Sequence, residues 1–271
     1  MPSTQQRRSA MTILTRSDTS HVATLTMTAP ARLNALSTAM LSALHAELDR
    51  IADDATVRVV ILRGAGRAFC AGHDLTELRD LRSQPDNGAA GLKTLFDRCA
   101  ALMMRVQSLP QPVIAQVQGL ATAAGCQLVA TCDLAVASDD ARFGVNGVNI
   151  GLFCSTPMVA LTRNIPAKMA FEMLTTGRFL TADEAAQEGL VNRVVHADHL
   201  DRDTRALAET IAAKLPAAVR IGKAAFYAQA RMSTAEAYAF TGAVMVENMA
   251  LDATAEGIDA FLTKRSPDWP A

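Results

Sequence analysis

The sequence predicts an α/β fold in which most of the sheet is parallel. Short apolar runs alternate with helical patterns, small-residue turns join them, and the chain from Pro157 onward is mostly helical. Half of the 271 residues are hydrophobic and 20% are charged, so a large core can be buried. In sheets of this class, ligands bind beyond the carboxyl ends of the strands.

The first predicted elements are a hairpin and a helix. Two β-prone runs, 11–16 and 21–27, flank a turn predicted at 17–20. Ser37 is a suitable N-cap for an amphipathic helix that ends near Asp54.

A buried strand is predicted at 57–63, directly before the stretch 67–78. Gly64 and Gly66 end this strand, because glycine adopts backbone angles that other residues avoid. Leu75 and Leu78 are spaced like one face of a helix. The segment is therefore predicted to be a strand, a glycine-rich turn and a helix N-terminus.

The same arrangement recurs further along the chain. A helical pattern over 91–107 precedes a second strand at 113–117, and Gly119 ends that strand. The small-residue stretch 119–128 then runs into a helix, and a third strand covers 134–137. Two similar turns therefore follow the carboxyl ends of two strands.

The remaining elements are mostly helices. They are predicted at 168–175, 181–188, 198–214, 233–249 and 254–264, with a short strand at 191–195. Thr181 and Glu184 have capping-box spacing, and Gly189 is placed to end that helix. We expect a disordered tail at 1–10, a core at 11–197, and a helical region at 198–271 that packs on the core or on another subunit.

Composition excludes several classes of function. The net charge is -1 and no lysine–arginine cluster forms a stripe, so no nucleic-acid partner is expected. No apolar run approaches the ~20 residues that cross a bilayer, and 1–10 lacks the apolar core of a secretory signal. The five cysteines match neither a zinc site nor a redox pair, so we expect no metal and a reducing, cytoplasmic setting.

The turn at 67–78 has two interpretations. It is either only a connection between strand and helix, or a site whose unpaired N–H groups bind an anionic or strongly polarised oxygen. Two such turns at adjacent strand ends suit an oxyanion hole, in which two backbone donors hold one carbonyl oxygen. Spacing alone leaves both interpretations open.

Motifs over nearly the whole chain from Met11 resemble the crotonase (enoyl-CoA hydratase/isomerase) superfamily. They are AFCAGHDL at 68–75, GLA at 119–121, GCQL at 125–128, CDLA at 132–135, RFG at 142–144, LTTG at 174–177 and FLTKR at 261–265. The resemblance implies a ClpP-like spiral of ββα repeats with a C-terminal helical region.

The resemblance also implies a site for an acyl-CoA or enoyl-CoA thioester, held by the backbone N–H groups of His73 and Ala124. The other implied substrate-binding residues are Leu33, Ala71, Asp74, Leu75, Thr76 and Ala121, with Phe261 and Lys264 reaching the ligand from a neighbouring subunit. Coenzyme A is then part of the substrate, and no bound cofactor is implied. The implied assembly is a homotrimer or a hexamer, a dimer of trimers.

The sequence departs from the family at two positions. The family's hydratases use two glutamates to place water and move a proton. Gln127 stands at the first position and Gly147 at the second. Gln127 can hold a water but cannot exchange a proton near neutral pH, and Gly147 supplies no group. The stretch 147–157 resembles a subgroup that lacks both glutamates, whose mitochondrial members are called enoyl-CoA hydratase domain-containing proteins.

Two hypotheses of function follow. The first is a lyase- or isomerase-type acyl-CoA enzyme of fatty acid metabolism, nominally an enoyl-CoA hydratase, that stabilises a thioester enolate. The second is a non-catalytic acyl-CoA-binding or regulatory oligomer. The His73 side chain is either a base or a polar wall of the pocket. Asp74 is expected to cap the following helix, Cys154 to pack, and Asn149 to orient a water or satisfy a loop.

Overall fold

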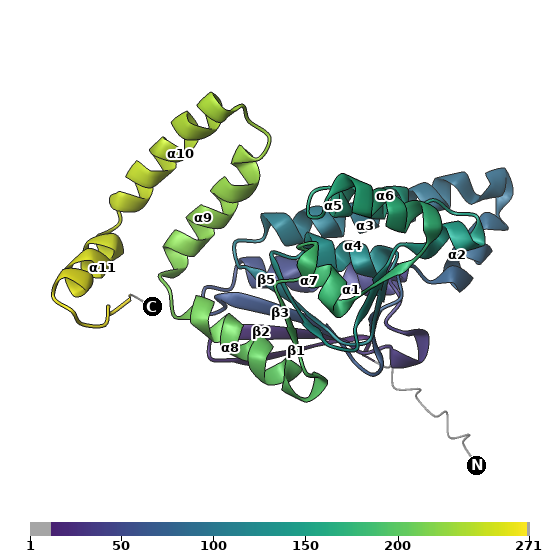
Figure 1. Cartoon of the computed structure of the whole chain (residues 1–271), viewed down its shortest axis with the longest axis horizontal. Helices are drawn as coiled ribbons and strands as arrows, with labels where there is room; N and C mark the ends of the chain where they lie inside the picture. Colours follow the sequence, from purple (N-terminus) through teal and green to yellow (C-terminus); the bar gives the residue numbers. More distant parts are fainter. Residues whose placement is uncertain (1–11, 270–271) are drawn as a thin grey trace, which may run out of the picture.

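Ten strands form two sheets in residues 12–269, the part of the chain that the computed structural model describes (Figure 1). The predicted tail at 1–10 lies outside these residues. The strands are β1 (Leu14–Thr19), β2 (Val22–Met27), β3 (Val59–Gly64), β4 (Ala68–Cys70), β5 (Val113–Val117), β6 (Leu120–Thr122), β7 (Leu134–Ser138), β8 (Arg142–Gly144), β9 (Phe179–Thr181) and β10 (Arg193–Val195).

From β3 to β8, successive strands alternate between the two sheets. The six-stranded sheet has the order β1-β2-β3-β5-β7-β10, and the four-stranded sheet has the order β4-β6-β8-β9. Only β1 with β2 and β8 with β9 pair antiparallel among these strands. Three consecutive strand pairs repeat one pattern: β3–β4, β5–β6 and β7–β8. In each pair the first strand belongs to the six-stranded sheet and the second to the four-stranded sheet, and a helix follows the pair. The predicted spiral of ββα repeats is confirmed.

The helices follow most of the predicted ranges. They are α1 (Thr38–Ala52), α2 (Leu75–Arg82), α3 (Ala89–Ser108), α4 (Ala124–Thr131), α5 (Ser155–Leu161), α6 (Ala167–Thr176), α7 (Ala182–Gln187), α8 (Leu200–Ala212), α9 (Pro216–Gln229), α10 (Thr234–Met249) and α11 (Asp252–Leu262). The caps at Ser37 and Thr181 are confirmed, since both side chains accept from backbone N–H groups of the first turn.

Three details differ from the sequence prediction. The strands β4, β6, β8 and β9 are not predicted from the sequence, because three residues are too few to show an alternating pattern. The turn of the hairpin lies at Ser20 and His21, which both have positive φ, rather than at 17–20. Ser17 still belongs to strand β1, where it pairs with Thr24. Helices α5 and α9 are not predicted, since neither Cys154 nor Leu215 at their N-caps makes a side-chain cap.

The two faces of the six-stranded sheet are covered by different helices. Val60 and Leu62 join the cluster that includes residues of α1 and α3, whereas Val59 and Ile61 join the cluster with α8. Successive strand residues point to opposite faces, so this alternation places the sheet between the two helical layers. Figure 1 shows α8 on the opposite side of the sheet from α3.

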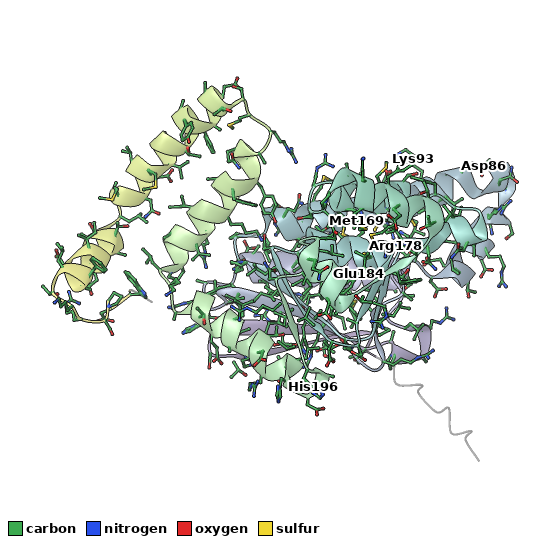
Figure 2. The ribbon with its side chains drawn as sticks, viewed as in Figure 1. Asp86, Lys93, Met169, Arg178, Glu184 and His196 are labelled. Atoms are coloured by element: carbon green, nitrogen blue, oxygen red, sulfur yellow. The ribbon has the colours of Figure 1, made fainter. Side chains whose placement is uncertain are left out.

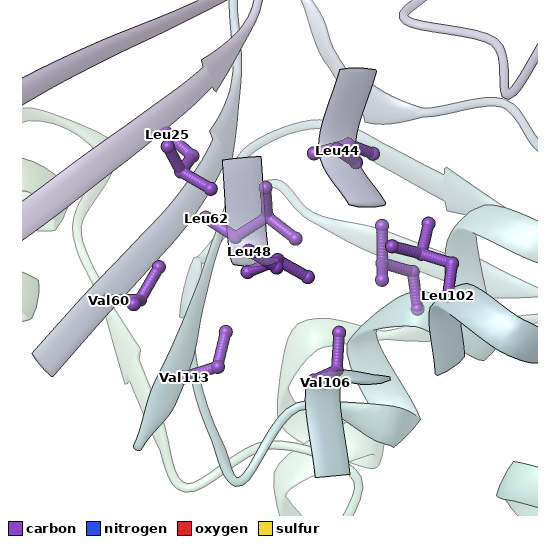
Figure 3. A pocket seen from close by; sticks show the side chains of 9 residues that line it. Leu25, Leu44, Leu48, Val60, Leu62, Leu102, Val106 and Val113 are labelled. Carbon is purple, nitrogen blue, oxygen red and sulfur yellow. The ribbon is translucent and has the colours of Figure 1, made fainter. Parts of the chain in front are cut away.

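An apolar void of about 10 Å³ lies between the sheet and helices α1 and α3 (Figure 3). It is lined by Leu25, Leu44, Leu48, Val60, Leu62, Leu102, Val106, Val113 and Leu128. A void of this size without polar partners is too small and too apolar to hold a ligand or an ordered water.

Helices α9 to α11 extend away from the core as an arm (Figure 1). Ala225 and Ala260 are the only buried residues within these three helices. The predicted division at residue 198 stays a prediction, although α8 packs on the sheet and the arm begins with α9. No helix within residues 12–269 is long and apolar enough to cross a membrane.

Side chains also join the helices that precede the arm (Figure 2). Arg178 forms ion pairs with Glu172 of α6 and Glu184 of α7, and its guanidinium lies 3.2 Å from the sulfur of Met169. These contacts hold α6 and α7 around the short strand β9.

Candidate functional site

The two small-residue turns meet at Gly72. Gly72 has φ +86, and a Cβ atom built on it would lie 2.9 Å from the Cβ of Ala123 and 3.1 Å from the backbone nitrogen of Ala124. A larger residue would push the turns apart, so glycine permits this approach. The loop after β4 and the loop after β6 therefore lie side by side.

The approach brings together two backbone donors without partners. Within residues 12–269, neither the N–H of His73 nor that of Ala124 makes a hydrogen bond. Ala124 is the first residue of α4, where N–H groups have no acceptor within the helix. Ala123 donates to the carbonyl of Gly144 over 2.8 Å and has φ +50 and ψ −120, a strained conformation for a residue with a side chain.

The segment before α1 supports the first turn. The N–H of Ala71 donates to Leu33 over 3.0 Å, and the N–H of Leu36 donates to Gly72 over 2.7 Å. The fully buried Asn34 donates to the carbonyls of Ala65 and Ala68. Leu33 and Ala71 thus lie beside the first turn, while Ala121 is buried in β6.

Asn34 is a supporting residue that the sequence prediction missed. Leu33 and Asn34 both have positive φ, which asparagine tolerates better than most residues. The signal was the irregular passage after Pro30, where an asparagine stands among apolar residues.

Asp74 caps α2, as predicted. Its carboxylate accepts from the N–H of Thr76 over 2.9 Å and pairs with Arg32. Burial opposes the charge, but Arg32 and the N–H groups outweigh burial and lower the pKa of Asp74. Leu75 follows at the start of α2 and is 58% exposed, next to the free N–H of His73.

The His73 side chain contacts the segment before α1 and helix α3. Its Nδ1 is 3.2 Å from the carbonyl oxygen of Leu36, and its ring packs edge-to-face on Phe96 with centroids 5.4 Å apart. Burial lowers the pKa of His73, so the neutral imidazole is favoured near neutral pH.

The two positions of the missing glutamates have different surroundings. Gln127 is buried on α4, and its Oε1 has no hydrogen-bond partner within residues 12–269. A Cβ on Gly147 would lie 2.4 Å from the carbonyl oxygen of Leu152 and 2.9 Å from the sulfur of Cys154. The loop therefore leaves no space for a side chain at 147. Cys154 is buried as predicted, and burial raises the pKa of its thiol.

The neighbourhood of Gly147 is tied to the second turn. The hydroxyl of Thr122 donates to Asn146 over 2.5 Å. Asn149 lies against Gly177, within 3.1 Å of the position that a Cβ there would take. The contact with Gly177 fits the interpretation of Asn149 as a residue that completes a loop.

Phe261 and Lys264 are not brought to the loops of their own chain. Phe261 lies in the last turn of α11 with 83% of its surface exposed, and Lys264 follows that helix. Figure 1 shows α11 and α2 at opposite ends of the molecule. Their predicted role therefore requires a second chain and stays a prediction.

A surface pocket of about 360 Å³ lies elsewhere, between α1 and α3. It is lined by Leu41, Ser42, His45, Ala46, Asp49, Arg98 and Ala101, none of which was predicted as a site residue. No group of His, Cys, Asp and Glu side chains within residues 12–269 is arranged to hold a metal ion.

Comparison with known proteins identifies relatives over most of the chain. The family model described as enoyl-CoA hydratase/isomerase matches residues 17–271. The human enoyl-CoA hydratase domain-containing protein 3, mitochondrial, is 46% identical over 240 residues, which cover 89% of this chain and 78% of the relative. The 2,3-dehydroadipyl-CoA hydratase of Escherichia coli is 34% identical over 246 residues, which cover 90% of this chain and 93% of the relative.

Solved structures agree with the fold. A crystal structure of enoyl-CoA hydratase from Mycobacterium smegmatis has a TM-score of 0.91 at 51% identity and covers 95% of this chain and 99% of that one. The structure of human enoyl-CoA hydratase domain-containing protein 3 has a TM-score of 0.91 at 43% identity, and the match covers 95% of this chain and 100% of that one. The resemblance to the superfamily and to this subgroup is therefore confirmed.

Proposed function

The chain belongs to the enoyl-CoA hydratase/isomerase family, and on that premise we propose that it binds an acyl-CoA thioester and polarises its carbonyl with the N–H groups of His73 and Ala124. The contact of the two turns at Gly72 carries this proposal, because both N–H groups stay free within residues 12–269. Two donors aimed at one oxygen stabilise the negative charge that develops as a thioester enolate forms.

The rest of the proposed site follows the surroundings of these donors. Leu33, Ala71, Leu75 and Thr76 line the path of coenzyme A beside His73, while Asp74 holds the start of α2. Coenzyme A is bound only as part of the substrate. Phe261 and Lys264 reach it from a neighbouring chain in a homotrimer or hexamer, which their exposure on the arm supports.

The proposed reaction needs little acid–base help from the protein. The positions of the two hydratase glutamates hold a glutamine and a glycine, and the loop at 147 has no space for a side chain. Ordinary hydration of an enoyl-CoA is therefore expected to be slow. The same observation favours the second candidate, a non-catalytic acyl-CoA-binding or regulatory oligomer.

Binding and turnover should be measured together on the purified full chain with crotonyl-CoA and a small panel of acyl-CoA esters. We expect calorimetry to detect binding while hydration of crotonyl-CoA stays below ~1 s⁻¹, the low end of typical enzyme turnover. Hydration within the usual range of ~1–10³ s⁻¹ would show that the missing glutamates are not needed. Failure of every ester to bind would refute both candidates.

Ala124→Pro tests the oxyanion assignment. Proline is tolerated at the first position of a helix but has no N–H, so the variant loses one donor. Ala123, at φ +50, lies outside the extended region that residues before proline prefer, so the fold of the variant is checked first. We expect a smaller red shift of the carbonyl stretching band of bound crotonyl-CoA, and any turnover to fall by about 10²–10³.

Thr234→Pro, at the first position of α10, is the matched control. It should change neither the carbonyl stretching band of bound crotonyl-CoA nor the turnover. Circular dichroism of both variants checks the fold. A folded Ala124→Pro variant with an unchanged carbonyl band would contradict the assignment.

The cytoplasmic setting stays a prediction. Several similar relatives carry the word mitochondrial in their names, including those from human and mouse. Fractionation of cells that express the tagged full chain would decide the compartment.

A further inference from the structure

The segment that follows α11 returns to the core through one side chain, Trp269. Its indole Nε1–H donates to the carbonyl oxygen of Ala213 over 3.0 Å. Ala213 is the C-cap of α8, the helix that packs on the six-stranded sheet. The last carbonyls of a helix have no partner within it, so this donor caps α8. The contact joins the end of the arm to the helix from which the arm begins (Figure 1).

The same indole lies on α11, over Gly257. A Cβ atom built on Gly257 would be 2.8 Å from Cη2 and 3.1 Å from Cζ3 of the indole. Glycine inside a helix costs about 1 kcal/mol relative to alanine, and at 257 it makes room for the indole. The other glycines of the arm, Gly222 and Gly242, have no atom of the described residues within 4 Å of that position. Of the three, only Gly257 is thus explained by a close contact.

Glu256 holds the segment between α11 and the indole. Its two carboxylate oxygens accept from the guanidinium of Arg265 over 2.6 and 2.7 Å, and one also accepts from the N–H of Asp268 over 2.8 Å. The bonds from Arg265 and then Asp268 lower the pKa of Glu256 to about 2, so the carboxylate is charged at neutral pH. A bidentate pair of this kind fixes geometry more than it adds stability. The segment therefore folds back along α11.

Helices α9 and α11 are attached to the core by different contacts. Lys223 of α9 donates to Asp133 over 2.6 Å, so α9 has an attachment of its own. Helix α11 buries only Ala260, and α10, which joins the two, buries none of its residues. Little apolar packing fixes the direction of α11, and the indole connects this helix directly to α8.

The residues with a proposed role at a neighbouring site lie at this end of α11. Phe261 follows Gly257 by about one helical turn, and Lys264 follows the helix. We propose that Trp269 is a positioning residue, which fixes the direction of α11 and thereby the place of Phe261 and Lys264. This inference rests on the proposed function, in which those two residues reach the acyl-CoA of a neighbouring chain. Trp269 touches no ligand and acts only through α11.

Gly257→Ala tests the contact without removing the tryptophan. The new methyl group would overlap the indole, which is the end of a side chain and moves more easily than the helix backbone. Trp269 is the only tryptophan of the chain, so its fluorescence reports this place alone. We expect the emission to shift to longer wavelength as water reaches the indole, although alanine strengthens the helix.

Gly242→Ala in α10 is the matched control, because it adds the same methyl group where no described atom lies within 4 Å. It should leave the emission unchanged. An unchanged emission in Gly257→Ala as well would show that the indole does not lie on α11, and the inference would be wrong.

Trp269→Ala removes the contact itself and is followed by hydrogen exchange. We expect the amides of α11 to exchange about tenfold faster, the size of one lost hydrogen bond, while those of α9 stay unchanged because Lys223 still holds that helix. Phe171→Ala removes an exposed aromatic side chain of α6 and should change neither helix. Native exchange of α11 in Trp269→Ala would overturn the inference.

Binding of butyryl-CoA, measured by calorimetry on the full chain, separates positioning from a purely structural role. We expect Trp269→Ala to weaken binding about tenfold. It should weaken binding no further in a chain that already carries Phe261→Ala and Lys264→Ala, because residues that act through one another are not additive. Additive losses would overturn the positioning role. If the native chain binds no acyl-CoA, the proposed function fails and this role with it, whereas emission and exchange still show whether the indole holds α11.

Discussion

The candidate site depends on single residues that accept unusual backbone conformations. Ala123 holds φ +50 and ψ −120 directly before the free N–H of Ala124. Gly72 lies against it at φ +86. Strain of this kind persists only where the surrounding structure holds it, and here the N–H of Ala123 is held by Gly144. The orientation of one donor is thus maintained at a cost in stability.

Ala123→Gly should stabilise the protein. Glycine adopts the conformation at 123 without strain, and the relief of ~1–3 kcal/mol exceeds the extra entropy of an unfolded glycine, ~0.5–1 kcal/mol. We expect urea denaturation to show a gain of about 1 kcal/mol in the free energy of unfolding. Ala239→Gly, at an exposed position of α10, is the control and should lose about 1 kcal/mol. A loss in both variants would show that position 123 is not strained.

Gly147→Ala should destabilise the protein. Its Cβ would lie 2.4 Å from the carbonyl oxygen of Leu152, so the loop must shift, at a cost of about 1–3 kcal/mol. Gly222→Ala in α9 has no atom within 4 Å of the new methyl group and should gain up to about 1 kcal/mol from helix propensity. Thermal and urea unfolding compare the two variants. A Gly147→Ala protein as stable as the native one would show that the loop readily admits a side chain.

At the scale of elements, the sequence predicts what is decided locally. The cap at Ser37 and the apolar face of α1 are local signals, and this helix was predicted to within two residues of its observed end. Strands β4 and β6 are not predicted, because three residues are too few to show an alternating pattern. The resemblance supplied His73 and Ala124, but the contact at Gly72 depends on the way the spiral stacks, which no local pattern encodes.

Helix α9 is held to the core by a buried polar cluster of Lys223, Asp133 and Tyr227. The ammonium group of Lys223 donates to the carbonyls of Val106 and Gln111 over 3.0 Å and to Asp133 over 2.6 Å. Tyr227 donates to the other carboxylate oxygen over 2.8 Å. Since α9 buries only one of its residues, this cluster rather than apolar packing fixes where the helix lies.

Lys223→Met should destabilise the core by about 3–5 kcal/mol, because it leaves the Asp133 carboxylate buried without its cation. The double variant Lys223→Met, Asp133→Asn should recover part of this loss, since the uncompensated charge is gone. Lys214→Met changes an exposed lysine and should stay within about 0.5 kcal/mol of the native protein. Urea denaturation measures all three variants. A loss as small in Lys223→Met as in Lys214→Met would mean that the cluster does not hold α9.

At the scale of the whole molecule, a buried core contrasts with an arm whose apolar side chains stay exposed within residues 12–269. Tyr238, Met245, Val246 and Met249 of α10 are each more than half exposed. Such a concentration of apolar surface marks an interaction surface, and a chain of one kind most simply covers it with copies of itself. The arm also carries Phe261 and Lys264, whose proposed role at a neighbour's site requires such an assembly.

Charge on the arm should therefore break the assembly and weaken ligand binding together. We expect sedimentation of the native chain to give a trimer or hexamer, and Val246→Glu with Met249→Glu to give smaller species, because burying carboxylates in an apolar interface is costly. Thr210→Glu, on the exposed side of α8, should keep the native mass. If Phe261 and Lys264 act across the interface, the arm variant should also bind acyl-CoA more weakly although His73 and Ala124 are unchanged. An arm variant that is monomeric yet binds with native affinity would restrict the site to one chain and leave assembly a role in stability alone.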